Sequence, residues 1–209
     1  MSTRALYDKW STTYDEVENK TRDLEKRACQ SVLSAVDFEN VIELGGGTGK
    51  NTLWLARCAK RVVSVELSPE MQAVAKTKVV AANVEFRLAD IREEWDFADG
   101  QVDLITCSLI LEHIEELAPI FRNAAVSLKP AGHFYLCELH PFKQYIGSKA
   151  RFDMDGKTHV LDCYRHHITD YSNAVALAGF AAVKIDEWFD DDDRKQIPRL
   201  VSFLFKLNK

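Results

Sequence analysis

The sequence has no apolar run long enough to cross a membrane, and its N-terminal residues are polar. A membrane-spanning helix needs about 20 consecutive apolar residues, so neither membrane insertion nor secretion is expected. Basic residues are not in excess, because 27 lysines and arginines face 32 aspartates and glutamates, for a net charge of −5. Without a basic stripe, nucleic acid is not an expected partner.

Cysteine is scarce and scattered, with five residues in 209 and no Cys-x-x-Cys pair. An odd number of dispersed thiols is typical of a reduced, cytoplasmic protein. The sequence also lacks internal repeats and low-complexity linkers, while 46% of its residues are hydrophobic. These features predict a single globular domain over residues 1–209, working in the cytoplasm as a monomer or homodimer.

Glycine, in contrast, is concentrated in one short segment between the apolar run 41–44 and a helical pattern at 51–60. The glycines of this loop are Gly45, Gly46, Gly47 and Gly49. Such a loop lets a ligand approach bare backbone beside a helix N-terminus. Glu66 ends the next apolar run, and a carboxylate about twenty residues beyond the loop commonly binds a ribose diol. A nucleoside cofactor is therefore expected; the alternative is a tight turn that binds nothing.

The glycine spacing and the residue before the loop indicate which nucleoside. A dinucleotide loop has the pattern Gly-x-Gly-x-x-Gly, whereas this loop reads Gly-x-Gly-x-Gly. Glu43 would sit poorly beside a pyrophosphate but well beside the sulfonium and ammonium of S-adenosylmethionine. We therefore expect S-adenosylmethionine as cofactor, with S-adenosylhomocysteine as its product. An NAD-dependent oxidoreductase is the rival, and the Tyr-x-x-x-Lys motif or cysteine pair that it would need is not evident.

Apolar runs and helical patterns alternate through the first two thirds of the chain. The runs lie at 41–44, 62–65, 84–88, 102–107 and 133–137, and the helical patterns at 51–60, 69–82 and 115–128. This alternation predicts a parallel sheet with helices on both faces. Ser68 and Pro69 are typical of a helix start, as N-cap and first-turn residue.

The remaining segments complete the predicted fold. We expect a helix at 22–36, no clear periodicity at 140–167, and a helix at 170–178. Strands at 181–188 and 199–206 would form an antiparallel hairpin around a solvated acidic loop at 190–194. The prediction is an α/β, Rossmann-like, doubly wound fold whose seven-stranded mixed sheet ends in this hairpin.

Six motifs in this order resemble those of the class I S-adenosylmethionine-dependent methyltransferases. The resemblance is to the small-molecule type 11 group, which includes the ubiquinone and menaquinone C-methyltransferases, and it covers most of the chain. The motifs lie at 7–15, 41–49, 65–71, 89–91, 109–114 and 128–132. Two positions depart from the common pattern: Glu43 stands for the more frequent aspartate, and Gly46 stands where many relatives have cysteine. Charge and small size survive, so neither puts cofactor binding in doubt.

The resemblance implies roles for residues that would hold the ribose and the amino acid part of the cofactor. Glu66 would accept both ribose hydroxyls, through charged hydrogen bonds worth ~1.5–3 kcal/mol each. Glu43 would hold the ammonium group, helped by the backbone around Cys107 and Ser108. The alternative for Glu66 is a solvated carboxylate at a strand end.

The adenine would be bound by residues after the second and third strands. Asp90 would accept from the adenine amino group, while the Ile91 N–H donates to a ring nitrogen. Leu67 and Met71 would sandwich the ring. Two alternatives remain: Asp90 can be a helix N-cap, and a methionine at helical spacing is usually part of the core.

Methyl transfer from a sulfonium mainly requires alignment of the reacting groups, which can supply most of the rate. A general base adds roughly 10²–10⁴-fold and is needed only if the acceptor loses a proton. The N-terminal segment, which closes over the site in relatives, offers Tyr7, Trp10 and Tyr14 as candidates for the base or for acceptor contacts; the alternative is an amphipathic helix that packs on the sheet. The others are His140, just past a strand end, and the pair His166 and His167. These histidines favour an O or N acceptor on a small molecule over a carbon acceptor.

No metal is expected, although His159, Cys163, His166 and His167 have spacings that a zinc ion could use. The organisation implied is an N-terminal helical cap (1–36), a cofactor-binding core (40–138), a substrate-side insertion (139–168), and a final helix with strand hairpin (169–209). Two rival functions remain. One is a protein or nucleic-acid methyltransferase, against which the net charge and the sequence at 107–110 argue. The other is a catalytically silent binding or regulatory protein.

Overall fold

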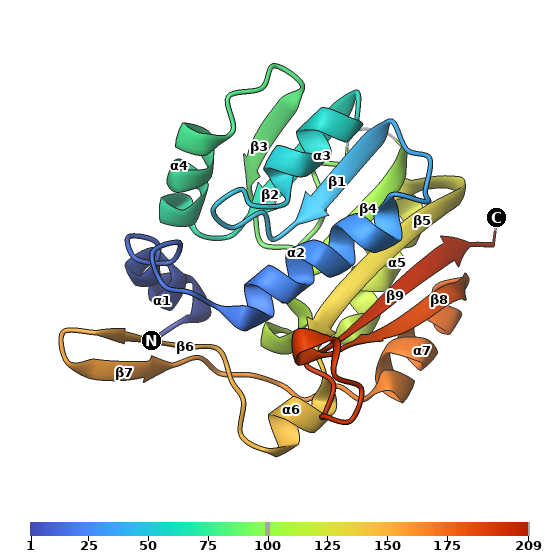
Figure 1. Ribbon diagram of the computed structural model, residues 1–209. Coiled ribbons are helices and arrows are strands. Elements are labelled where there is room, and N and C mark those ends of the chain that lie inside the picture. Colours follow the sequence, from blue (N-terminus) through green and yellow to red (C-terminus); the bar gives the residue numbers. More distant parts are fainter. Residues whose placement is uncertain (99–100, 209) are drawn as a thin grey trace.

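Seven strands form one mixed sheet in the order β3-β2-β1-β4-β5-β9-β8 in the computed structural model, which describes residues 1–98 and 101–208 (Figure 1). β1 to β5 run parallel, while β9 pairs antiparallel with β5 and β8. The expected doubly wound α/β fold is confirmed. Residue 209, the last residue of the predicted segment 169–209, lies outside the described residues. The strands are β1 (Asn40–Leu44), β2 (Arg61–Glu66), β3 (Val84–Leu88), β4 (Val102–Ser108), β5 (Leu128–Leu139), β8 (Phe180–Trp188) and β9 (Leu200–Leu207).

Alternate residues of the central strands face two layers of helices. Val41 and Tyr135 belong to the core beneath α2 and α3, whereas Ile42 and Phe134 belong to the core beneath α5 and α7. Because helices cover both faces (Figure 1), these strands are apolar along their whole length rather than every second residue. The helices are α1 (Thr3–Trp10), α2 (Lys20–Leu33), α3 (Thr52–Cys58), α4 (Pro69–Lys78), α5 (Leu117–Ser127) and α7 (Ile168–Leu177).

Helix α4 shows both the success and the limit of prediction from propensity. Ser68 caps it as expected, since its Oγ accepts from the backbone N–H three residues on at 3.1 Å. The helix ends at Lys78, earlier than predicted, because a turn in which the Val84 N–H donates to the Ala81 carbonyl leads into β3. In the ranges that the structure describes, no helix is long and apolar enough to cross a membrane.

The segment at 140–167, predicted to lack clear periodicity, contains regular structure. Its elements are α6 (Pro141–Tyr145), β6 (Arg151–Met154) and β7 (Lys157–Val160). β6 and β7 form a separate two-stranded sheet around Asp155 and Gly156, whose φ angles of 52° and 69° suit a two-residue hairpin turn. Phe152 stacks on Trp10 with ring centroids 4.9 Å apart, so the hairpin packs beneath the N-terminal segment (Figure 1).

The acidic loop is only partly solvated, which corrects the expectation for 190–194. Its first residue, Asp190, accepts from Nε and Nη2 of Arg199 at 2.5 and 2.6 Å. These bonds tie the short helix η2 (Asp190–Asp192) to the start of β9, while Asp191 and Asp192 are exposed. The like charges therefore do not all point to solvent, because one of them has a fixed cationic partner.

Candidate functional site

Three adjoining cavities open at the carboxyl ends of β1, β2 and β4. The strand order reverses between β1 and β4, and α/β sheets bind ligands at such a switch point. We call them the central cavity (about 490 Å³, lined by Glu43 and the glycine loop), the hairpin cavity (about 260 Å³, lined by Trp10 and Arg151) and the outer cavity (about 700 Å³, lined by Leu67 and Asp90).

The glycine loop fits tightly against β2. The N–H groups of Gly45 and Gly46 donate to the Val65 carbonyl at 2.8 and 3.0 Å, and Gly45 has a φ of +72°. A Cβ on Gly46 would lie 2.1 Å from Ser64 Oγ, whereas a Cβ on Gly47 would meet nothing within 4 Å. The loop therefore leaves Gly47 open while close packing excludes side chains elsewhere.

Glu66 is held rigidly at the end of β2 and lines both the central and outer cavities. Its Oε1 accepts from the Ser68 N–H at 2.9 Å, and its Oε2 accepts from the Gly47 N–H at 2.8 Å. Burial raises the pKa of the carboxyl, while these backbone donors lower it. Each oxygen keeps a lone pair, so the carboxylate can still accept two hydroxyl groups.

Glu43 is buried on β1 with its side chain directed to the central cavity. Thr52 Oγ1 and Ser64 Oγ both donate to its Oε2, at 2.5 and 2.9 Å. Burial nevertheless raises the pKa of Glu43 to about 7. In the described part of the chain, two further buried atoms of this cavity, Thr106 Oγ1 and Asn51 Oδ1, have no hydrogen-bond partner. The cavity thus offers several oxygen atoms to a donor such as an ammonium group.

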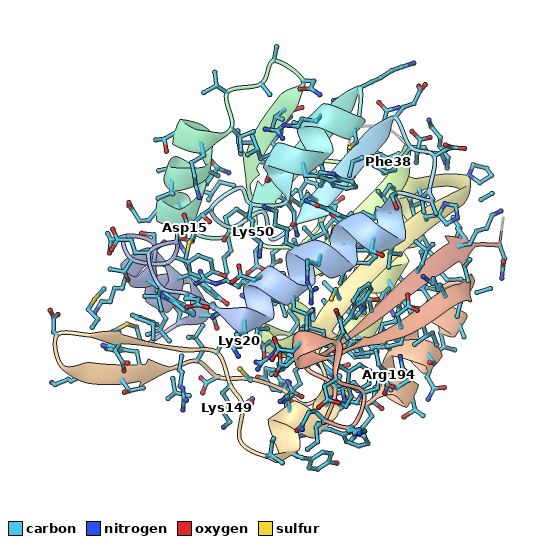
Figure 2. The ribbon with its side chains drawn as sticks, viewed as in Figure 1. Asp15, Lys20, Phe38, Lys50, Lys149 and Arg194 are labelled. Atoms are coloured by element: carbon cyan, nitrogen blue, oxygen red, sulfur yellow. The ribbon has the colours of Figure 1, made fainter. Side chains whose placement is uncertain are left out.

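The charge of the central cavity also suits a cationic ligand. Seven acidic and two basic side chains line it. Lys50, labelled beside Asp15 in Figure 2, lies 3.8 Å from Glu25, and burial lowers the pKa of this lysine. The acidic residues are Asp15, Glu16, Glu18, Asp23, Glu25, Glu43 and Glu66, and the basic ones are Arg22 and Lys50.

The N-terminal segment contains two Tyr-Asp pairs, Tyr7-Asp8 and Tyr14-Asp15. Their aspartates bind the core, and their tyrosines face the cavities. Asp8 accepts from Ser68 Oγ at 2.6 Å. Asp15 accepts from Thr48 Oγ1 of the glycine loop at 2.8 Å and from Lys78 Nζ at 2.5 Å. The tyrosines that precede these aspartates line the cavities: Tyr7 lines all three, and Tyr14 lines the central and hairpin cavities. The two aspartates therefore fix the tyrosines over the site.

Tyr14 lines both the central and the hairpin cavity. The guanidinium of Arg22 covers its ring at 4.0 Å. Burial raises the pKa of Tyr14 to about 12, so its phenol stays protonated at neutral pH. Tyr14 is therefore suited to contact ligands rather than to act as a base.

The residues expected to bind adenine are only partly brought together. Leu67, Asp90 and Ile91 line the outer cavity, but Met71 lines the central cavity and packs with α1. Leu67 and Met71 therefore line different cavities in the described part of the chain, and their sandwich around the adenine stays a prediction. Asp90 accepts from Nε and Nη2 of Arg92 at 2.9 and 2.5 Å, and this contact lowers its pKa.

Cys107 and Ser108 lie on opposite sides of β4. The Cys107 side chain is fully buried in the core beneath α5, where burial raises the pKa of its thiol. Ser108 lines the central cavity beside Thr106. Alternation along the strand explains the difference, because neighbouring side chains point to opposite faces.

The three histidines proposed as catalytic lie elsewhere. Among the described residues that line the cavities, His140, His166 and His167 do not occur. His140 is buried as the N-cap of α6, and its Nε2 lies 3.2 Å from Glu187. His166 Nε2 lies 2.7 Å from the Ile114 carbonyl, and His167 caps α7. Capping and core contacts turn these side chains away, so their positions do not support a catalytic role.

A different histidine borders the site. His113, at the end of η1 (Leu111–His113), lines the outer cavity, and its Nε2 lies 2.9 Å from the Tyr7 hydroxyl. Its Nδ1 lies 3.0 Å from the Asp162 carbonyl. Because a carbonyl only accepts, Nδ1 carries the proton of the neutral ring, and Nε2 accepts from Tyr7. The sequence motif at 109–114 pointed to this loop, but nothing in it indicated a partner 106 positions away.

Comparisons with known proteins agree with this geometry. Residues 42–136 match the family described as "Methyltransferase domain". A demethylmenaquinone methyltransferase of Tropheryma whipplei (strain Twist) is 24% identical over 195 residues, covering 91% of this chain and 78% of the relative. A ubiquinone biosynthesis O-methyltransferase of Xanthomonas campestris pv. campestris (strain B100) is 29% identical over 108 residues, covering 51% of this chain and 45% of the relative.

The fold has a close counterpart among solved structures. A structure described as a DhpI-SAM-HEP complex has a TM-score of 0.76 and 21% identity, covering 96% of this chain and 94% of the other. Its cofactor fits the features above, since the central cavity is acidic and contains buried oxygen atoms without partners. The match of residues 42–136 to a methyltransferase domain, the strand order of the sheet and the acidic central cavity therefore all agree with an S-adenosylmethionine-dependent methyltransferase.

Proposed function

We propose that this methyltransferase transfers the methyl group to an oxygen or nitrogen atom of a small-molecule acceptor. The observation that carries the proposal is the Tyr7–His113 hydrogen bond at the point where the three cavities meet. An acceptor hydroxyl or amine must lose a proton during methylation, and this pair gives the proton a place to go.

Residues of two cavities would hold the cofactor. Glu66, placed between the central and outer cavities, would bind the ribose hydroxyls. Glu43 would bind the ammonium, and Lys50 would bind the carboxylate of the same ligand. Ile91 would face the adenine in the outer cavity, with Asp90 keeping or exchanging its contact to Arg92. S-adenosylmethionine, when bound, supplies an electrophilic methyl group on a sulfonium.

The protein's own contribution to the chemistry is a proton relay. The Tyr7 oxygen can accept a hydrogen bond from the acceptor, while its own proton is shared with His113 Nε2. As the acceptor atom forms its bond to the methyl group, it gives its proton to Tyr7, and Tyr7 passes a proton to His113. Tyr7 ends as a phenol and His113 as an imidazolium. Burial raises the pKa of Tyr7 well above its usual value, which favours this relay over a standing phenolate.

The relatives support a small acceptor. One is described as a demethylmenaquinone methyltransferase and the other as a ubiquinone biosynthesis O-methyltransferase, so both act on small molecules. The second name supports an oxygen acceptor in this chain. Five unpaired cysteines support a cytoplasmic location. A state of monomer or homodimer, and the four-part division of the chain, stay predictions.

Methyl-transfer assays on Tyr7→Phe and His113→Gln test the proposal, with the exposed His167→Gln as a matched control. Across a panel of phenols, amines and carboxylic acids, the first two changes should lower kcat by about 10²–10⁴-fold, the usual contribution of a general base. Their affinity for S-adenosylhomocysteine should change little, and His167→Gln should resemble the wild type. Unchanged kcat in both variants, or a product methylated on carbon, would overturn the proposal.

A further inference from the structure

The hairpin cavity is separate from the parts of the site that would hold the cofactor. Trp10 and Tyr14 of the N-terminal segment, Leu139 at the end of β5 and Ala150 ahead of β6 line it. Tyr7 connects it to the central cavity, since this residue lines both. With about 260 Å³, it has room for a small molecule whose reactive atom reaches the Tyr7 hydroxyl.

The charge of the hairpin cavity is opposite to that of the central cavity. Four basic side chains line it, against a single acidic one, Glu112. Arg199 is neutralised by its two bonds to Asp190. In the described ranges, no carboxylate lies within 4.0 Å of the other three cations. Those three cations are Arg22, Lys149 and Arg151.

These three cations come from two elements on either side of the cavity. Arg22, on α2, is fixed because its guanidinium donates to the carbonyls of Tyr14 and Val17 and covers the Tyr14 ring. Lys149 and Arg151 are exposed where the chain enters β6, and Lys149 is labelled there in Figure 2. A guanidinium fixed by its own hydrogen bonds, together with two exposed cations of another segment, is an arrangement that binds carboxylate or phosphate.

Glu112, the acidic residue that lines this cavity, lies next to the Tyr7–His113 pair. It is only 6% exposed, and its Oε1 lies 3.9 Å from His113 Nε2. Its Oε2 is buried and has no hydrogen-bond partner in the part of the chain described. Burial raises the pKa of this carboxyl, and its unpaired oxygen can hydrogen-bond to a hydroxyl or amine of a ligand. The carboxyl of the cavity is therefore buried, whereas Lys149 and Arg151 are exposed.

We propose that the hairpin cavity binds the methyl acceptor, and that this acceptor carries an acidic group held by Arg22, Lys149 and Arg151. Its nucleophilic oxygen or nitrogen lies at the opposite end, toward Glu112 and Tyr7. The acidic group is a carboxylate or a phosphate, which share the chemistry that these cations recognise. This inference rests on the proposed function, and it adds the class of substrate: a small organic acid, not a neutral molecule.

Isothermal titration calorimetry with three aromatic probes tests this preference on the protein saturated with S-adenosylhomocysteine. Benzoate and phenyl phosphate carry the acidic group, and benzamide is the neutral analogue of benzoate. At least one acid should bind about tenfold or more tightly than benzamide, equal to about 1.4 kcal/mol. The tighter of the two acids distinguishes a carboxylate site from a phosphate site.

The double variant Lys149→Gln/Arg151→Gln should abolish this preference, whereas Lys157→Gln, an exposed change on the same hairpin outside the cavity, should preserve it. Affinity for S-adenosylhomocysteine should be the same in all variants. Benzamide binding as tightly as both acids, or an acid preference that survives the double variant, would overturn the inference. Failure of S-adenosylhomocysteine to bind would instead contradict the proposed function, and the acid preference can then be read separately on the free protein.

Discussion

The pKa of Glu43 makes cofactor binding depend on pH in a way that can be calculated. This carboxyl is buried, receives hydrogen bonds from Thr52 and Ser64, and has a pKa of about 7. If its ionised form alone binds the cofactor ammonium, the apparent affinity follows the ionised fraction. That fraction rises from about one in eleven one pH unit below the pKa to about ten in eleven one unit above it. Affinity should therefore increase about tenfold across this interval, or about 1.4 kcal/mol.

Two substitutions separate this effect from other titrations. Glu43→Gln should make the dissociation constant of S-adenosylmethionine nearly independent of pH and weaken binding by ~1.5–3 kcal/mol at the upper end, the usual worth of a charged hydrogen bond. Thr52→Val removes a donor that lowers the pKa of Glu43, so the midpoint of the pH dependence should move upward.

Isothermal titration calorimetry in buffers of different ionisation enthalpy measures both the affinity and the protons released. Below the pKa of Glu43, the wild type should release nearly one proton on binding, and Glu43→Gln should release fewer. A wild-type affinity that does not change with pH, or an equal slope in Glu43→Gln, would refute the assigned role of this carboxylate.

Three further predictions follow from the contacts described. Asp15→Asn weakens the bond to Lys78 that holds the N-terminal segment on α4, and it should raise the dissociation constant of S-adenosylmethionine several-fold. An unchanged dissociation constant in calorimetry would show that the segment stays in place without this ion pair. His140→Ala removes the cap of α6 and should lower stability by about 1 kcal/mol in chemical denaturation, with kcat kept within about twofold of the wild type. Burial and then Glu112 raise the pKa of Glu138 to about 8, so the folded state holds a proton that the unfolded state releases, and stability falls as pH rises from about 4.5 to 8. Glu138→Gln should reduce this fall in thermal melts, and equal pH slopes in the two proteins would exclude Glu138 as its source.

The sheet and its cofactor carboxylates could be predicted from sequence because they depend on short-range patterns. Apolar runs bounded by glycine or by a capping residue indicate where each parallel strand ends. Glu66 could be predicted in this way because it is the last residue of β2. Residues at the ends of neighbouring parallel strands must lie close together, so Glu43 and Glu66 reach the same cavity.

The features of the site that could not be predicted from the sequence depend on the direction of a side chain or on a partner far away in the chain. His140 does follow a strand end, but whether it faces the cavity is decided by its capping of α6. The Tyr7–His113 bond joins residues 106 positions apart, and no local pattern indicates such a pair. The β6–β7 hairpin had a usable signal in Asp155-Gly156, although few apolar residues flank it and no alternation was visible.

The close approach of Gly46 to Ser64 links two positions whose evolution would otherwise be independent. A methyl group added at 46 collides with a hydroxyl that also donates to Glu43. A larger residue in place of Gly46 therefore requires that this hydroxyl move away or be lost, and either change weakens a hydrogen bond to the acid at position 43. Gly46→Ala should accordingly be tolerated poorly alone and better with Ser64→Ala, and aligned sequences of the family should show the two sites changing together.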